Sequence, residues 1–240
     1  MSSAKIIAIT KPIISASADK QAIYDESGFQ IGWGDPLKMT VDEFVAYVAR
    51  VSNPSNQNNV DTAPKLLRYL AKHKHWSPFE MVHIVMEINT TRDIARQVLR
   101  HRSFSFQEFS QRYADPTQDL GFVTREARLQ DTKNRQNSIE TDDPFLQNDW
   151  YIYQSDVIEA SKAAYNWAIE RGVAKEQARA VLPEGLISSR LYMAGSLRSW
   201  IHYCQVRTDV ATQKEHREIA LDAWYEITSQ FPSLTDALDI

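Results

Sequence analysis

The sequence predicts an α+β fold, mostly helical, with a small mixed or antiparallel sheet. Apolar residues recur at the helical period along most of the chain, one stretch alternates with a period of two, and no β-α-β rhythm follows. The lack of that rhythm argues against a doubly wound parallel sheet. At 240 residues the chain is long enough to bury a large core, and we expect a single domain over residues 1–240.

Two helices are expected first. Thr40 and Glu43 have the spacing of a capping box, and apolar residues follow at helical positions. The turn-rich run 52–59 ends this helix, because it contains an Asn-Pro pair. A second helix is expected over 63–74, where three leucines share one face.

A strand and a third helix come next. Residues 82–89 alternate with a period of two, which is typical of a strand with one buried face. Thr91 is expected to cap the helix that follows. Gln97 and Arg100 lie three residues apart on the polar face of that helix, so both can reach one ligand. The opposite face is apolar and consists of Ile94, Ala95, Val98 and Leu99.

The segment 115–149 is polar and rich in Pro, Asn and Asp, which predicts a long surface excursion. A helix is expected from about 150 to 171, ending before Gly172, a natural residue for the left-handed position after a helix. A short helix should run through Arg179 and stop before Pro183.

The last predicted elements are a strand near 187–194 and helices over 197–206 and 213–229. The first of these helices divides into two faces. Its apolar face consists of Leu197, Trp200, Ile201 and Cys204; its polar face consists of Arg198, His202 and Gln205.

Composition excludes several classes of protein. No stretch approaches the roughly 18 apolar residues of a membrane span. The seven glycines form neither a G-x-G-x-x-G nor a P-loop pattern, so a bound phosphate would need side-chain donors. Cys204 is the only cysteine, which excludes an intramolecular disulfide and favours a reducing, cytoplasmic setting. No metal-binding motif is present, and we expect no metal site.

The residues that carry chemistry gather between Arg96 and Tyr113. The stretch holds Arg96, Gln97, Arg100, His101, Arg102, Ser103, Ser105, Gln107, Glu108, Ser110 and Arg112. Guanidinium groups bind phosphate through paired hydrogen bonds, so an anion site can form here without a glycine-rich turn. The alternative interpretation is a solvated basic helix end followed by a polar loop.

Within this stretch, Arg100-His101-Arg102 followed by seven residues and Ser110 resembles the R-H-R-(x7)-S signature of flavin-dependent thymidylate synthases, the ThyX family. Further elements match that family in order and spacing. They are His75 to Glu80 (H-x-[ST]-P-F-E), Ala95-Arg96-Gln97, Ser110 to Tyr113, Ala178-Arg179 with Leu182-Pro183, and Arg198, His202 and Arg207.

The resemblance implies a ThyX-like fold and a methyltransferase of nucleotide biosynthesis. It implies conversion of dUMP to dTMP, with 5,10-methylenetetrahydrofolate as carbon donor, FAD as hydride carrier and NADPH as reductant. It also implies a homotetramer whose sites are shared between subunits. We expect these small molecules as partners, and neither nucleic acid nor a membrane.

The resemblance also implies roles for individual residues. The residues expected to contact dUMP are Gln97, Arg100, Glu108, Ser110, Gln111, Arg112, Arg179 and Arg207. The residues expected to contact FAD are His75, Ser77, Arg100, His101, Arg102, Glu108, Ser196, Arg198 and His202. Arg207 is expected to be catalytic, lying against the uracil ring and favouring its ionisation at N3.

The single cysteine bears on the mechanism. Uracil C5 is a poor nucleophile until electron density enters the ring, and ordinary thymidylate synthases supply it by adding a cysteine to C6. Cys204 lies on a predicted apolar face, where a buried thiol without a chemical role is expected. An arginine at the pyrimidine edge would instead stabilise the anionic ring.

Two other functions stay open at this stage. A nucleic-acid-binding module is possible because Phe104, Phe106, Phe109 and Tyr113 interleave with arginines, as in a stacking platform, although the net charge of -4 argues against it. The other is a flavin-binding protein without catalysis. For His202, a solvated surface position is the alternative to a flavin contact.

Overall fold

The computed structural model describes residues 2–15, 21–24, 26–27, 30–34, 38–235, 237–238 and 240. The chain divides into two compact units. Unit 1 consists of Met1–Lys5, Met86–Ala194 and Tyr203–Ala223; unit 2 consists of Ile6–Val85, Gly195–His202 and Trp224–Ile240. The predicted α+β class is confirmed, and a single domain over 1–240 stays a prediction.

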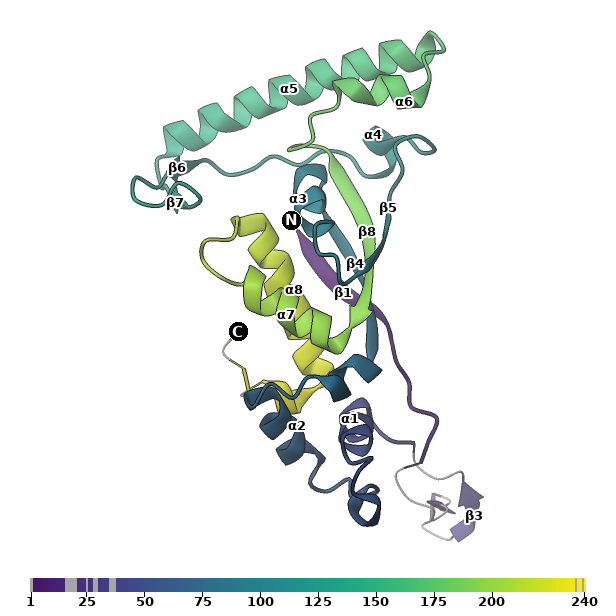
Figure 1. Cartoon of the computed structure of the whole chain (residues 1–240). Helices are drawn as coiled ribbons and strands as arrows, with labels where there is room; N and C mark the ends of the chain where they lie inside the picture. The colour runs from purple at the N-terminus through teal and green to yellow at the C-terminus, as the bar shows by residue number, and fades with distance from the viewer. Residues whose placement is uncertain are drawn as a thin grey trace. The chain divides into compact units, whose positions relative to one another are not determined.

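The main sheet has four strands in the order β1-β4-β8-β5 (Figure 1). Their bounds are β1 Ser3–Ile9, β4 His83–Thr91, β5 Ser105–Glu108 and β8 Ser188–Ser196. Strand β5 pairs antiparallel with β8. Strands β4 and β8 also run antiparallel, because Arg92 N donates to Ile187 O beyond one end and Leu197 N donates to Val82 O beyond the other.

The period-two pattern produced β4 as predicted. The predicted apolar series Val82, Ile84, Met86 and Ile88 is fully buried, and β4 begins one residue after Val82. Strand β8 is also confirmed and begins one residue later than expected, at Ser188. Strand β5 was not predicted: its four residues are too short for a periodic signal, and pairing with β8 supplies the hydrogen bonds that make it a strand.

Unit 2 holds the first predicted helices, α1 Val41–Ala49 and α2 Ala63–Lys72, with short 3-10 turns η1 Pro54–Asn56, η2 Ser77–Met81 and η4 Pro232–Leu234. The capping box is present: Glu43 N donates to Thr40 Oγ1 at 3.2 Å, and Thr40 N donates to the Glu43 carboxylate at 2.7 Å. An antiparallel pair, β2 Gln21–Tyr24 and β3 Gln30–Gly34, was not predicted.

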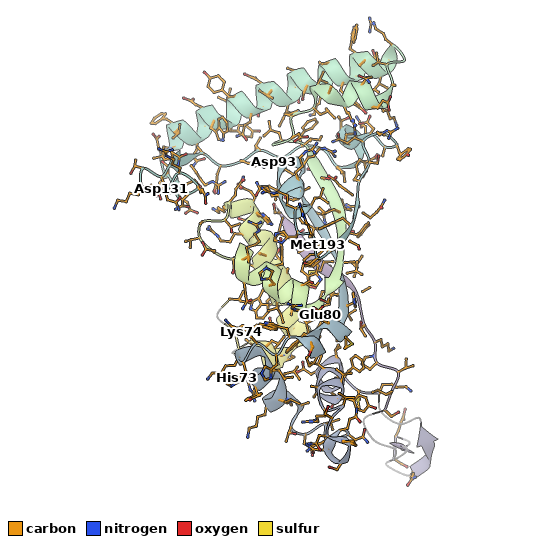
Figure 2. The ribbon with its side chains drawn as sticks, in the orientation of Figure 1. His73, Lys74, Glu80, Asp93, Asp131 and Met193 are labelled. Atoms are coloured by element: carbon orange, nitrogen blue, oxygen red, sulfur yellow. The ribbon has the colours of Figure 1, made fainter. Side chains whose placement is uncertain are left out.

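Unit 1 holds helix α3 Arg92–Val98, which begins after Thr91 as expected. The Thr91 hydroxyl does not cap a backbone N–H, however. It donates to Asp93 Oδ1 at 2.6 Å, and Arg125 Nη2 donates to the same oxygen at 2.6 Å (Asp93 is labelled in Figure 2). The first N–H groups of α3 donate instead to backbone carbonyls, Arg92 N to Ile187 O at 3.0 Å and Asp93 N to Glu184 O at 3.1 Å.

The excursion 115–149 contains a short helix, α4 Pro116–Asp119, and a hairpin, β6 Arg128–Gln130 with β7 Ser138–Glu140, none of which its composition predicted. The long helix α5 covers Pro144–Glu170 and so begins earlier than the predicted residue 150. The reason is local: the Asp143 carboxylate accepts from Phe145 N and Leu146 N, and Pro144 occupies the first turn.

Helix α5 ends as predicted, with Gly172 at φ +77°. Helix α6 Lys175–Ala178 and turn η3 Arg179–Val181 follow and pack against α5 (Figure 1). The core between them consists of Tyr165, Ala168, Ala178 and Leu182.

The C-terminal helices are α7 Leu197–Arg207 and α8 Lys214–Gln230, close to their predicted bounds. Leu197, Trp200, Ile201 and Cys204 are buried, whereas Arg198, His202 and Gln205 are exposed, as the sequence predicted. No helix in the described ranges combines the length and apolar character that a membrane span requires.

Replacing Thr40 with alanine removes the hydroxyl that caps α1 in unit 2. We expect a loss of about 1 kcal/mol in the free energy of unfolding, measured by urea titration, because Glu43 N loses its acceptor. Thr40→Ser keeps the hydroxyl and is the control. Equal stability of the Ala and Ser variants would show that the capping box does not stabilise the fold.

Candidate active site

The signature residue His101 is bonded to an arginine 106 residues away in sequence. Arg207 Nε donates to His101 Nε2 at 2.9 Å, within unit 1. A guanidinium has no acceptor and stays protonated, so Nε2 must carry a lone pair here. The contact therefore favours a neutral His101 ring whose proton is on Nδ1. It joins two of the residues that the resemblance assigned to FAD and dUMP.

Around His101 lies a cluster of aromatic rings. The ring of Tyr203 meets that of His101 edge to face at a centroid distance of 4.9 Å, and the rings of Phe104 and His216 lie at 6.4 and 6.3 Å. Tyr203 and His216 are fully buried. Because Phe104 packs in this cluster, it is not a free platform for nucleic-acid bases, which weakens that alternative.

Burial controls protonation in this cluster. Burial, followed by the charge of Arg207, lowers the pKa of His216 to about 3, so its ring is neutral near pH 7. Burial also raises the pKa of Tyr203 and of Cys204. Cys204 is fully buried, so the thiol is neither ionised nor accessible, as the sequence predicted.

Glu108, assigned to both ligands, lies at the end of β5. Ser189 Oγ of β8 donates to its Oε1 at 2.9 Å, and Arg92 Nη1 lies 3.5 Å from the same oxygen. Arg92 also faces Glu184, whose carboxylate accepts hydrogen bonds from Arg96 Nε at 2.8 Å and from Arg96 Nη2 at 2.5 Å. These contacts tie the end of β5 to helix α3 and hold the Glu108 carboxylate in place.

A second group brings Arg112 and Arg179 together. Arg112 Nη2 lies 3.4 Å from the Glu176 carboxylate, and Arg179 Nε donates to the Glu176 backbone carbonyl at 3.3 Å. Arg112 also donates its backbone N–H to Ser110 Oγ at 3.4 Å. Two of the residues assigned to dUMP, Arg112 and Arg179, therefore contact Glu176, a third, Ser110, contacts the backbone of Arg112, and the neighbouring Gln111 is buried.

In unit 2, two residues assigned to FAD, Ser196 and Arg198, contact Glu80 (labelled in Figure 2). Arg198 Nη1 donates to Glu80 Oε1 at 2.6 Å. Two hydrogen bonds lower the pKa of Glu80; the one from Ser196 has the larger effect and the one from Arg198 the next largest. Ser77 begins the same turn, η2, that carries Glu80. The carboxylate thus organises Ser196 and Arg198 next to this turn.

His75 follows a residue in an unusual backbone conformation. Lys74 has φ +59°, the only positive value among the described non-glycine residues. This region is unfavourable for a residue with a Cβ and is more common at functional sites. His75 is exposed, and its ring lies edge to face with Tyr69 at 5.9 Å. His202 is exposed on α7, compatible with either of its two interpretations.

The predicted site residues thus fall into both units. Unit 1 contains Gln97, Arg100, His101, Arg102, Glu108, Ser110, Gln111, Arg112, Arg179 and Arg207; unit 2 contains His75, Ser77, Ser196, Arg198 and His202. The arginines of the signature, Arg100 and Arg102, are exposed. Which of these residues contact a ligand stays a prediction.

Sequence reasoning missed the residues that hold the predicted ones in place. These are Arg92, Glu176, Glu184, Ser189, Tyr203 and His216. No motif indicates these residues. Some lie far in sequence from the residue that they contact, and others lie in helices whose sequence shows only an ordinary amphipathic pattern. Glu80 was within a quoted motif, but its contacts with α7 were not foreseeable.

Unit 1 also contains several pockets, two of which have volumes of about 360 and 840 Å³. Both are lined by Arg125, Glu126 and Lys214, none of which the sequence analysis singled out. In the ranges that the structure describes, no three His, Cys, Asp or Glu side chains are grouped as a metal ion would need.

Comparison with known proteins adds to this geometry. A family model described as "Thymidylate synthase complementing protein" matches residues 37–233. A protein of Paramecium bursaria Chlorella virus 1, named as a probable flavin-dependent thymidylate synthase, is 43% identical over 237 residues, covering 99% of both chains. A flavin-dependent thymidylate synthase of Synechocystis is 50% identical over 206 residues, covering 86% of this chain and 92% of its own.

A solved structure shares the fold. It is the UMP/dUMP methylase PolB from Streptomyces cacaoi bound with 5-Br dUMP, with a TM-score of 0.71 over 98% of this chain and 95% of that one. Its sequence identity is 20%, so the likeness concerns the fold alone.

The burial of Cys204 predicts slow reaction with thiol reagents. At pH 8 the native protein should react with a disulfide reagent at least about 100-fold more slowly than free cysteine, since burial hinders access and raises the thiol pKa. Unfolding in guanidinium should restore full reactivity. Fast labelling of the native protein would show that the thiol is accessible and would reopen a cysteine nucleophile.

Proposed function

The chain belongs to the family of flavin-dependent thymidylate synthases, and from this membership we propose that it methylates dUMP to dTMP, using FAD, NADPH and 5,10-methylenetetrahydrofolate. The reaction needs three tasks of the protein. It must hold a nucleotide phosphate, stabilise negative charge on the pyrimidine ring and hold a flavin. Each task is supported by a different group of side chains.

The side chains assigned to FAD include hydrogen-bond donors that can bind its diphosphate. FAD has a diphosphate, and Arg100, Arg102 and Arg198 offer exposed or half-exposed guanidinium groups that can bind it through paired hydrogen bonds. Ser77, Ser196 and His202 add neutral donors. When bound, FAD carries the hydride that completes the methyl group. His75, the signature His101 and Glu108 are the further residues that we assign to this cofactor.

The phosphate of dUMP is assigned to Arg112 and Arg179, with Ser110 as a neutral donor. Among the residues that the structure describes, Arg112 forms an ion pair with Glu176, and both side chains are about half exposed, at 55% and 50%. Such pairs contribute about 0–1 kcal/mol. A dianionic phosphate can therefore displace Glu176 at little cost, and Glu176 keeps the guanidinium oriented until then.

Charge on the pyrimidine is assigned to Arg207. Its Nε is bonded to His101, which leaves the Nη hydrogens of the planar fork for a ligand. Placed at the ring edge, this fork stabilises the N3 anion and increases electron density at C5. Gln97, Arg100, Glu108 and Gln111 are the remaining dUMP contacts in the proposal. The buried, protonated Cys204 supports a mechanism without a thiol adduct.

The observation that carries the proposal is the 2.9 Å hydrogen bond between Arg207 and His101. It brings the last arginine of the pattern to the R-H-R signature, as a shared site requires. Purified protein should contain bound FAD and should form dTMP from dUMP only when NADPH and methylenetetrahydrofolate are both present. Flavin-loaded protein that leaves dUMP unchanged would support the alternative of a flavin-binding protein without catalysis.

Arg207→Lys should retain FAD and lose turnover by about 100-fold or more, because a point charge cannot replace a planar fork that is bonded to both His101 and the ring. The rate of dTMP formation and the flavin absorbance are the measurements. Arg217→Lys is the matched control, since Arg217 donates to the Val210 carbonyl and has no assigned role. Unchanged turnover in Arg207→Lys would contradict the catalytic assignment.

We further propose the homotetramer and the cytoplasmic location that the sequence analysis expected. Helix α5 supports an assembly of subunits. Exposed residues on it follow alternating steps of four and three: Leu146, Trp150, Tyr153, Val157, Ala160, Ala164 and Trp167. This heptad spacing is typical of helices that pair along one seam. Tyr153 and Trp167 are 68% and 55% exposed, which is unusual for large rings on a free surface.

The double variant Tyr153→Glu with Val157→Glu should reduce the mass of the assembly in solution, because two carboxylates would be buried in the seam. Light scattering after size-exclusion chromatography measures it. Asn166→Glu, which adds a charge on α5 outside the seam, should leave the mass unchanged. An unaltered mass in the double variant, with the helix content retained, would exclude this seam as a subunit interface.

A further inference from the structure

A chain of hydrogen bonds in unit 1 connects two residues that are neighbours in sequence, Glu215 and His216. Gln213 Nε2 donates to Glu215 Oε2 at 2.9 Å, and Gln97 Nε2 donates to Gln213 Oε1 at 2.8 Å. His216 Nδ1 lies 3.3 Å from Gln97 Oε1. These hydrogen bonds therefore connect Glu215 in the first turn of α8, through Gln213, to Gln97 on α3, and connect Gln97 to His216 on α8.

We call this series of hydrogen bonds, Glu215–Gln213–Gln97–His216, the relay. The direction of every bond in the relay follows from Glu215, its charged end. Glu215 forms an ion pair with Arg128, so its carboxylate can only accept. Gln213 must then present its NH₂ to Glu215 and its oxygen to Gln97. Gln97 in turn must present its NH₂ to Gln213 and its oxygen to His216. His216 is left to donate from Nδ1.

The same logic fixes the ring of His216. With the proton on Nδ1 and the ring neutral, Nε2 carries a lone pair. His216 is fully buried, and its Nε2 has no hydrogen-bond partner in the part of the chain that the structure describes. The ring lies beside Tyr203, at a centroid distance of 5.8 Å, and beside His101. It therefore faces the cluster that Arg207 joins.

The main effect of this arrangement is to fix the orientation of the Gln97 side-chain amide. A glutamine side chain is flexible, and its amide can rotate by half a turn, which exchanges donor and acceptor. In the relay both amide atoms are held, one by Gln213 and one by His216. One hydrogen of Nε2 and one lone pair of Oε1 remain, at fixed places, for a ligand.

We propose that Glu215, Gln213 and His216 are positioning residues that hold the amide of Gln97 in one orientation for the pyrimidine nucleotide. The proposal rests on the proposed function, in which Gln97 contacts dUMP. It adds residues to that site that no motif indicated, and it assigns the buried His216 a role as a donor of fixed tautomer rather than as a base.

The geometry of histidine, asparagine and glutamine provides a matched test. The amide nitrogen of asparagine can occupy the place of Nδ1, because both atoms are bonded to Cγ, whereas that of glutamine reaches the place of Nε2. His216→Asn should therefore keep the bond to Gln97, and His216→Gln should lose it. His216→Phe keeps the ring volume without any donor.

In flavin-loaded protein, His216→Phe and His216→Gln should raise the KM and the calorimetric Kd for dUMP about tenfold, with flavin content and the KM for methylenetetrahydrofolate within twofold of the parent. His216→Asn should restore dUMP binding to within about threefold. A purely structural role would instead lower thermal stability and affect both substrates alike in all three variants. That pattern, or equal dUMP affinity in the Asn and Gln variants, would overturn the proposal.

A second measurement is independent of binding. Solid-state ¹⁵N spectra of histidine-labelled protein, assigned by subtracting the spectrum of His216→Asn, should show His216 protonated at Nδ1 and unprotonated at Nε2 at pH 7. Gln213→Leu should weaken that preference. A proton on Nε2 would refute the relay. If the parent protein failed to bind dUMP at all, the proposed function would fail, while the ¹⁵N result would still decide the direction of the relay.

Discussion

The bond between Arg207 and His101 is the interaction on which the rest of the candidate site depends. A permanently charged donor meets a ring nitrogen that can accept only when it is unprotonated. The charge of the guanidinium therefore keeps the ring neutral at that nitrogen, and the ring keeps the guanidinium in one place. Three buried or half-buried aromatic rings surround the pair and limit its freedom to move.

A few fixed charges determine which way the neutral polar side chains in unit 1 donate and accept hydrogen bonds. Glu215, held by Arg128, directs the amides of Gln213 and Gln97, and Arg207 directs the ring of His101. Neutral groups whose donor and acceptor ends could exchange are thus given one orientation each. Preorganised dipoles of this kind stabilise charge on a ligand without the cost of reorienting solvent.

The arginines assigned to anionic ligands differ from this fixed core. Arg100 and Arg102 are exposed, and Arg112 and Arg198 form ion pairs at half-exposed positions. Exposed pairs contribute little to stability because solvent screens them. They are therefore well suited to exchange a carboxylate for a phosphate, whereas the pair of Arg128 and Glu215, 11% and 16% exposed, is suited to remain in place.

Local periodicity and caps were sufficient to predict the α+β class, the helices α1, α2, α7 and α8, the strand β4 and the burial of Cys204. The sequence also determined the family, since the R-H-R signature and its companion motifs match by position. Three features became visible only in the folded chain: β5 is a strand, the first turn of α3 donates to the carbonyls of Ile187 and Glu184 instead of to Thr91, and His216 and Glu176 contact Gln97 and Arg112. These contacts join residues far apart in the chain or depend on burial, so no local pattern can encode them.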